Sequence, residues 1–180
     1  AIASESDVLK LWQGLGYYSR ARNLHSTAKH IVQELQGVFP NNYKGLLHLK
    51  GIGDYTASAI ASFCFNEVCA VVDGNVYRFL SRYFGIQTPI NDRFAHGEFK
   101  TKAALLMDGT QPGTFNQALM EFGALQCTPK NPFCTQCPFA KKCVAFKRCL
   151  ALAKLLFNKK MDKESIDKST IDEIAKIDLL

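Results

Sequence analysis

The sequence predicts an all-α fold, formed by one compact domain or by parts of two. Apolar residues recur at intervals of three and four, which is the period of a helix, and glycines and prolines separate the runs. Only residues 69–72 have an extended pattern, and this segment is too short to found a sheet. The 180 residues, 47% of them apolar, are enough to bury a core without disulfide bonds.

Each predicted helix is bounded by glycine, proline or polar residues. The glycine turn 14–16 separates the first two helices, Gly37 and Pro40 end the second, and the turn 51–53 precedes the fourth. The fourth is rich in Ala and Ser, as expected of a helix that packs closely on its neighbours. In chain order, the predicted helices cover about 8–12, 24–35, 43–48, 56–65, 74–84, 92–107 and 114–124.

The charge distribution suits a polyanionic partner. The net charge is +6, and the first 157 residues carry 17 basic and 10 acidic side chains, although many unrelated proteins share such a surplus. Residues 158–180 are charged and poor in aromatics, so we expect a frayed helix or a tail there. No apolar run approaches the roughly 18 residues of a membrane span, and residues 1–10 lack a secretory signal, so we expect a soluble protein.

Five of the seven cysteines lie within residues 127–149, which favours a metal site over a disulfide framework. Four have the spacing C-x6-C-x2-C-x5-C: Cys127, Cys134, Cys137 and Cys143. Structural zinc sites usually pair their ligands in two short knuckles, whereas one short spacer between longer ones favours a [4Fe–4S] cluster. Unligated buried cysteines are a poorer alternative, because the prolines of this loop leave little core to bury them. Cys149 falls outside the pattern.

The segment Leu49-Lys50-Gly51-Ile52-Gly53 has the form of a helix-hairpin-helix turn. Its glycines allow the backbone to approach a phosphate, and the amides that open the next helix can point at it with the helix dipole behind them. A plain glycine cap between two helices is the simpler alternative. The apolar Ile52, the flanking Lys50 and the downstream cysteine loop favour the hairpin.

Together, these features and several further motifs resemble the helix-hairpin-helix, iron–sulfur DNA glycosylase superfamily, and within it the MutY-type adenine glycosylases. The likeness covers about residues 4–146. Besides the four cysteines, the motifs that carry it are LGYYSRARNL over 15–24, GIGDYTA over 51–57, VDGNV over 72–76 and FNQALMEFGA over 115–124.

The resemblance implies excision of adenine mispaired with 8-oxoguanine or guanine from double-stranded DNA. The target nucleotide must leave the duplex, and cleavage of its N-glycosidic bond leaves oxocarbenium character on the sugar. By resemblance, Asp73 is the carboxylate that stabilises this charge, and Asn75 helps to order the catalytic water or the carboxylate. Without that context, an Asp before Gly-Asn is a helix cap or a turn residue.

Tyr55 stands where endonuclease III-like relatives, which also cut the strand, have a lysine that forms a Schiff base. A tyrosine cannot do this, so the resemblance implies a monofunctional glycosylase that uses water, in which the catalytic-site Tyr55 hydrogen-bonds near the carboxylates. Tyr17 matches the aromatic residue that wedges into the opposite strand, the alternative being a core or surface tyrosine. We expect Arg20 and Arg22 to contact phosphates or cap helices rather than bases.

The predicted organisation is a helical barrel portion over 1–110, with its hairpin at about 43–66, an iron–sulfur region over 111–149 and a divergent tail over 150–180. The family protonates adenine with a Glu that precedes the matching segment, and it carries a C-terminal lesion-recognition domain; the sequence contains neither motif. We therefore expect a fragment, a truncated gene product or a decayed copy that binds a cluster and DNA but excises adenine poorly or not at all.

We expect a monomer without a membrane partner, in the cytoplasm near the nucleoid of a bacterium or in the nucleus or mitochondrion of a eukaryote. Three alternatives stay open. The first is an endonuclease III-like bifunctional enzyme, which Tyr55 disfavours. The others are a non-catalytic iron–sulfur module that binds DNA and a zinc-ribbon binder.

Overall fold

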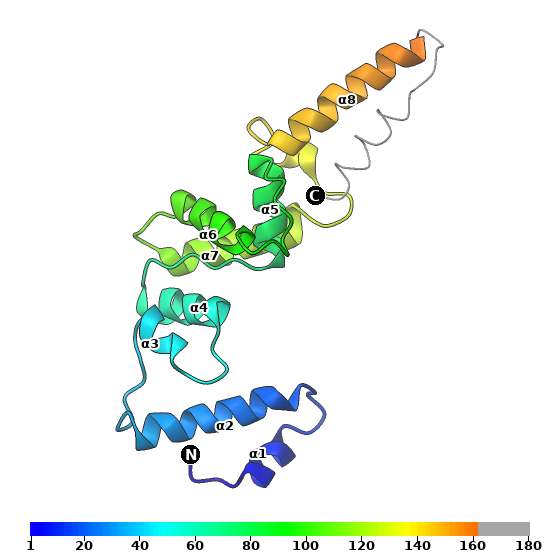
Figure 1. Ribbon diagram of the computed structural model, residues 1–180. Coiled ribbons are helices and arrows are strands. Elements are labelled where there is room, and N and C mark those ends of the chain that lie inside the picture. Colours follow the sequence, from blue (N-terminus) through cyan, green and yellow to red (C-terminus); the bar gives the residue numbers. More distant parts are fainter. Residues whose placement is uncertain (162–180) are drawn as a thin grey trace. The chain divides into compact units, whose positions relative to one another are not determined.

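The computed structural model describes the backbone of residues 1–161 and the side chains of residues 1–155. Within those bounds every regular element is helical and no strand occurs, which confirms the all-α prediction (Figure 1). Most of the predicted tail over 150–180 lies outside the described residues. The elements are α1 (Glu5–Leu11), α2 (Tyr18–Gln33), α3 (Tyr43–Leu47), α4 (Asp54–Phe65), α5 (Gly74–Phe84), α6 (Ala95–Leu106), α7 (Pro112–Glu121), the π-helical turn η1 (Phe122–Gln126), the 3₁₀ turn η2 (Cys134–Gln136) and α8 (Val144–Met161).

The chain forms two compact units that alternate along the sequence. The first unit contains Ala1–Ala70 and Met107–Thr114, and the second contains Val71–Leu106 and the described residues from Phe115 onward. The predicted division into 1–110 and 111–149 follows the cysteine motif rather than packing, and it stays a prediction.

The core of the first unit lies between α3 and α4. Leu46, Leu49, Ala57 and Ala61 are buried together, and partly buried apolar residues surround them, including Ile52 from the turn. Small Ala and Ser residues on α4 allow the close packing predicted from its composition, and Gly113 at the start of α7 approaches so closely that a Cβ there would lie 2.9 Å from the Ser62 carbonyl.

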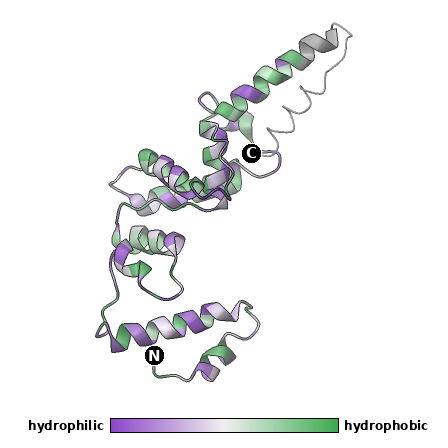
Figure 2. Cartoon of the chain, in the orientation of Figure 1, coloured by the Kyte–Doolittle hydropathy of each residue, from purple (hydrophilic) through white to green (hydrophobic). Residues whose placement is uncertain are grey.

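The buried face of α2 differs from the predicted one. Leu24 and Val32, which belong to the apolar repeat, are 59% and 55% exposed, whereas Ala21, His25 and Thr27 are buried. The polar side chains are satisfied there, since His25 Nε2 contacts the Ala3 carbonyl at 3.0 Å and the Thr27 hydroxyl donates to a backbone carbonyl. Figure 2 accordingly shows hydrophilic and hydrophobic residues mixed along α2.

In the second unit, α5 packs against α6, η1 and α8. Val76 and Leu80 from α5 are fully buried, as is Phe99 from α6. The helix ends at Gly85, whose φ of +71° favours glycine, and a Cβ there would lie 2.6 Å from Cγ1 of Val144, the first residue of α8. Gly85 and Val144, which are far apart in the sequence, therefore lie next to each other at the end of α5.

The segment between α4 and α5 was predicted to be extended at 69–72, and it forms no strand. One of its amides is bound instead by a buried side chain from α7, because the Val71 amide donates to Oδ1 of Asn116 at 3.0 Å. This segment leads directly to Asp73 and the first turn of α5, and α5 covers the range predicted for it.

Candidate nucleic-acid interface and cysteine cavity

The predicted hairpin turn lies between α3 and α4, and α2 holds it from one side. Gly51 has a φ of +83°, and a Cβ there would lie 2.6 Å from the Cβ of Asn23. The Thr27 hydroxyl donates to the Lys50 carbonyl at 2.8 Å, while the Lys50 side chain is exposed. Gly53 caps α4, and an added Cβ there would meet nothing within 4 Å, so the approach to the helix is open.

The first turn of α4 carries the predicted Tyr55, which is 46% exposed. Its neighbour Asp54 accepts a hydrogen bond from the Tyr43 hydroxyl of α3, which joins the two helices of the hairpin. The turn and the first residues of α4 therefore carry three kinds of polar group: backbone amides, the Tyr55 phenol and the side chain of Lys50, which precedes the glycines.

The other predicted DNA contacts lie around the loop between α1 and α2. Tyr17 is 81% exposed and has a φ of +47°, an uncommon conformation for an aromatic residue, which costs roughly 1 kcal/mol. The Arg20 guanidinium lies 5.5 Å from the centroid of the Tyr17 ring and 5.6 Å from that of Trp12. Arg22 Nε pairs with a Glu5 carboxylate oxygen at 3.1 Å, and both side chains are more than half exposed.

Asp73 and Asn75 lie together at the start of α5. Asp73 caps the helix, because its Oδ1 accepts a hydrogen bond from the Val76 amide at 2.8 Å. Its second oxygen, Oδ2, accepts one from the Asn75 side-chain amide at 3.1 Å. Asp73 is thus a helix cap, and its half-buried carboxylate lies at the positive end of the helix.

Arg78, one turn further along α5, connects this pair to the chain before the cysteines. Its Nη2 donates to Oδ1 of Asn75 at 2.8 Å and to the Gly123 carbonyl, and its Nε donates to the Cys127 carbonyl at 2.8 Å. The π-helical turn η1 makes the contact with Gly123 possible. In it, the Cys127 amide donates a hydrogen bond to the Phe122 carbonyl, whereas in an α-helix it would donate to the Gly123 carbonyl. The Gly123 carbonyl is therefore available to Arg78.

Arg82, a turn beyond Arg78, binds the cysteine loop itself. Its guanidinium donates to the carbonyls of Thr128 at 2.7 Å and Pro129 at 3.1 Å, and it contacts Sγ of Cys127 at 3.4 Å. The Cys143 thiol in turn lies 3.4 Å from the Arg82 carbonyl. One residue of α5 thus contacts the first and the last of the four predicted ligands.

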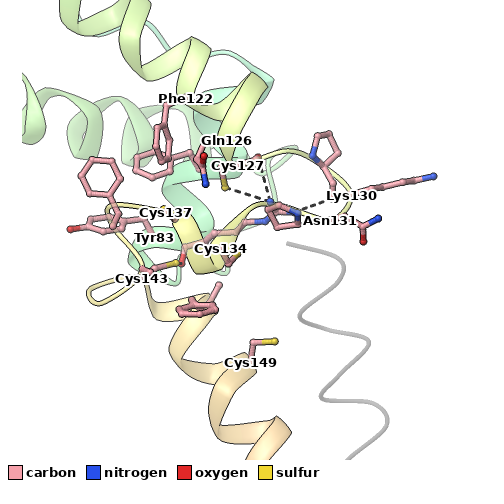
Figure 3. Close-up of a pocket in the computed structure, with 18 residues that line it drawn as sticks. Tyr83, Phe122, Gln126, Cys127, Lys130, Asn131, Cys134, Cys137, Cys143 and Cys149 are labelled. Atoms are coloured by element: carbon pink, nitrogen blue, oxygen red, sulfur yellow. Dashed lines mark hydrogen bonds between the residues drawn. The ribbon is translucent and has the colours of Figure 1, made fainter.

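All four predicted cysteines line one cavity of about 620 Å³ in the second unit (Figure 3). Its apolar wall is aromatic and includes Phe79, Phe122 and Phe139, whose rings contact each other. Cys149, from the second turn of α8, also lines it. Among residues 1–155, no group of three or more Cys, His, Asp or Glu converges as ligands of one metal ion.

The cysteines also influence each other electrostatically. Burial raises the pKa of the Cys134 thiol, and the neighbouring Cys127, Cys143 and Cys137 raise it further, because a negative charge among other thiolates is unfavourable. Arg82 lowers the same pKa by its positive charge. This charge offsets only part of the effect of burial and of the other cysteines, so the Cys134 pKa stays above its usual value.

The structure brings the predicted residues together in three groups. Lys50, Gly51, Ile52 and Gly53 form the hairpin, beside which α4 carries Tyr55, and Tyr17, Arg20 and Arg22 surround the loop before α2; all lie in the first unit. Asp73, Asn75 and the four cysteines lie in the second unit. Sequence reasoning missed Arg78 and Arg82, whose spacing on one face of α5 was the available signal.

None of the helices formed by the described residues has the length and the apolar character needed to cross a membrane.

Comparison with known proteins identifies relatives of this chain. The adenine DNA glycosylase of Arabidopsis thaliana is 49% identical over 133 residues, which cover 74% of this chain and 21% of that protein. The adenine DNA glycosylase of Homo sapiens is 46% identical over 138 residues, which cover 76% of this chain and 25% of that protein. The chain thus spans about a fifth to a quarter of the length of these relatives.

Among solved structures, a thermostable thymine-DNA glycosylase is similar, with a TM-score of 0.74 and 32% sequence identity over 82% of this chain and 68% of that chain. Residues 1–99, which include the hairpin, Tyr55, Asp73 and Asn75, match the family described as HhH-GPD superfamily base excision DNA repair protein. This chain therefore belongs to the HhH-GPD superfamily of base excision DNA repair proteins.

Proposed function

We propose that this chain supplies the DNA-binding hairpin and the catalytic carboxylate of an adenine DNA glycosylase. Its substrate would be adenine mispaired with 8-oxoguanine or guanine in double-stranded DNA. The observation that carries this proposal is the position of Asp73, whose two oxygens are held by the Val76 amide and by Asn75 at the start of α5. The identity of this chain with adenine DNA glycosylases supports the choice of base.

The reaction breaks the bond between the sugar C1′ and adenine N9, and the electron pair leaves with the adenine. Positive charge develops on the sugar, and a carboxylate near it lowers the energy of that state. Asp73 would serve as this carboxylate. Because Arg78 fixes Oδ1 of Asn75, the Asn75 amide can hold Oδ2 of Asp73 in one direction while water adds to the sugar.

Tyr55 supports hydrolysis rather than strand cleavage. A phenol in the first turn of α4 cannot form the Schiff base on which a lyase depends. The endonuclease III-like alternative is therefore not favoured.

Duplex DNA would be bound through the hairpin and the loop before α2. The open side of Gly53 and the first amides of α4 suit a backbone phosphate, and the exposed Lys50 adds a cation. Tyr17 would wedge into the strand opposite the flipped nucleotide, and Arg22 would contact the backbone. We propose a monomer that acts where genomic DNA is kept, in a nucleoid, a nucleus or a mitochondrion.

We propose that the cysteine cavity holds a [4Fe–4S] cluster, and two observations support this: four thiols line one space, and Arg82 places a positive charge beside them. Cys127, Cys134, Cys137 and Cys143 would hold the cluster. When bound, it would tie these positions to one inorganic core and could exchange an electron. The ordered loop would then direct lysines to the DNA backbone: Lys130, Lys141 and Lys142.

Metal analysis of protein purified without oxygen tests the cluster assignment. We expect iron and acid-labile sulfide, with Cys64→Ser, outside the cavity, as the matched control for Cys134→Ser. Only the second variant should lose iron. A colourless protein with stoichiometric zinc would support the zinc-ribbon alternative.

Single-turnover release of adenine from a duplex with adenine opposite 8-oxoguanine tests the activity. We expect slow release by the chain and none by Asp73→Asn, with duplex affinity changed by less than about twofold. Equal release by both proteins would contradict the assignment of Asp73. A covalent adduct trapped by borohydride would favour the lyase, and tight binding without release would favour the non-catalytic module.

A further inference from the structure

The loop between α1 and α2 holds an exposed aromatic ring on an unfavourable backbone. Gly14, Gly16 and Tyr17 all have positive φ angles, of +88°, +66° and +47°. The two glycines adopt this region without strain, whereas Tyr17 does not. Its ring is nevertheless largely exposed, so burial of the ring does not explain why the conformation persists.

Contacts from outside the strained residues hold the loop. Trp12 Nε1 donates to the Gly16 carbonyl at 3.0 Å, which fixes the residue before Tyr17. The Arg20 amide donates to the Tyr17 carbonyl at 2.9 Å, which fixes the residue from the other side. The Arg20 guanidinium then lies within 5.6 Å of the centroids of both the Trp12 and Tyr17 rings.

We propose that Arg20 is a positioning residue for Tyr17. Its planar cation contacts both rings, and it thereby fixes the exposed ring in the orientation that stacks on a nucleobase of duplex DNA. The inference rests on the proposed function for the identity of that ligand. Arg20 then contributes to DNA binding by orienting Tyr17, in addition to any contact that its guanidinium makes with a phosphate.

Arg22 provides the contrast, because it lies two residues further along the same helix and pairs with Glu5 instead of an aromatic ring. Both arginines contribute one positive charge to the same surface. Replacement by lysine keeps that charge and removes the flat guanidinium. Arg20→Lys and Arg22→Lys are therefore a matched pair in which only the first should disturb the loop.

The first test needs no DNA, because Trp12 is the single tryptophan of the chain and its emission reports the loop directly. Arg20→Lys should shift the emission and increase quenching by acrylamide, since a lysine shields the ring less. Arg22→Lys should leave both unchanged. Identical spectra for Arg20→Lys and the unaltered chain would overturn the proposal.

The second test measures coupling between Arg20 and Tyr17 in binding to a duplex with adenine opposite 8-oxoguanine. Arg20→Lys should weaken binding by about two- to fivefold, the size of an exposed cation–π contact, and leave the salt dependence unchanged. In a Tyr17→Ala background the same change should have no effect. Arg93→Lys, which also removes a guanidinium from a ring but in the second unit, is the control.

The outcomes separate the inference from the proposed function. Additive effects of the Tyr17 and Arg20 changes on duplex affinity would overturn the positioning role while DNA binding stands. A chain that binds no duplex, yet shows the emission change only for Arg20→Lys, would overturn the proposed function and keep the role of Arg20 in holding the loop.

Discussion

The hairpin of the first unit and the cysteine region of the second are stabilised in opposite ways. The hairpin depends on backbone geometry and close packing. Gly51 has a left-handed backbone and lies close to Asn23, and Leu49 is part of the buried core. In the cysteine region, two arginines of α5 donate to carbonyls more than forty residues away in the sequence. The first is a local motif, and the second depends on long-range hydrogen bonds.

This difference predicts how each region responds to change. A packed turn is sensitive to added volume, because its neighbours cannot move without disturbing the core. A region held by a guanidinium is sensitive to loss of the donor, because several carbonyls lose their partner at once. The following predictions test this contrast.

The largest effect is expected where both kinds of sensitivity meet, at Gly123. A Cβ at this position would lie 2.5 Å from the Asn75 carbonyl oxygen, which is backbone and cannot rotate away. Gly123→Ala should lower the free energy of unfolding by roughly 3 kcal/mol, measured by chemical denaturation. Gly97→Ala in α6, where an added Cβ meets nothing within 4 Å, should be neutral or stabilising. Equal losses for both would refute the close approach.

Removal of the Arg78 donor should have a somewhat smaller effect. Arg78→Met leaves the Cys127 and Gly123 carbonyls and the Asn75 amide oxygen without this partner, which should cost about 2–3 kcal/mol of unfolding free energy. Adenine release should fall as well, since Asn75 no longer fixes Asp73. Arg93→Met, which removes an exposed guanidinium, is the control, and an equally small change for both would contradict the network.

In the hairpin, the two glycines should respond unequally. Gly51→Ala combines a left-handed backbone with a Cβ only 2.6 Å from Asn23, so we expect a loss of about 2 kcal/mol in unfolding free energy and weaker duplex binding. Gly53→Ala adds a methyl group in open space and should keep stability within about 0.5 kcal/mol. If Asn23→Gly, which removes the Cβ that lies 2.6 Å from the added methyl group, does not relieve part of the Gly51→Ala loss, the steric explanation is wrong.

The smallest change in stability is expected at the exposed pair of Arg22 and Glu5. Arg22→Ala should alter the free energy of unfolding by less than about 0.5 kcal/mol, because an ion pair in water is worth little. Its effect should appear in duplex binding instead, where the slope of log affinity against log salt falls by about 1 for a lost phosphate contact. An unchanged slope would remove Arg22 from the DNA interface.

The same contrast explains what the sequence could predict. The hairpin is a contiguous motif, and the helix at 74–84 is bounded by Asp73, a capping residue, and Gly85, a left-handed terminator. Both could be recognised because their determinants lie within a few residues. The four cysteines were predicted as ligands in the same way, from their spacing; they line one cavity, and their role as ligands stays a prediction.

The remaining features depend on partners far apart in the sequence. Arg78 and Arg82 resemble surface arginines until η1 and the cysteine loop are placed beside α5. The π-helical register at Phe122–Gln126 has no composition signal, and the predicted helix at 114–124 runs into it without a break. On α2, His25 and Thr27 are buried with their polar atoms hydrogen-bonded, while Leu24 stays exposed. The spacing of apolar residues cannot predict this, because it does not show where hydrogen-bond partners lie.

The meeting of Gly85 with Val144 also has a consequence for the order of folding. A nascent chain can form α5 as soon as that helix leaves the ribosome, but the side that receives α8 stays uncovered until Val144 has been synthesised. Contacts closed over such a long segment form slowly. The second unit should therefore acquire protection from hydrogen exchange late, after translation has passed its last cysteine.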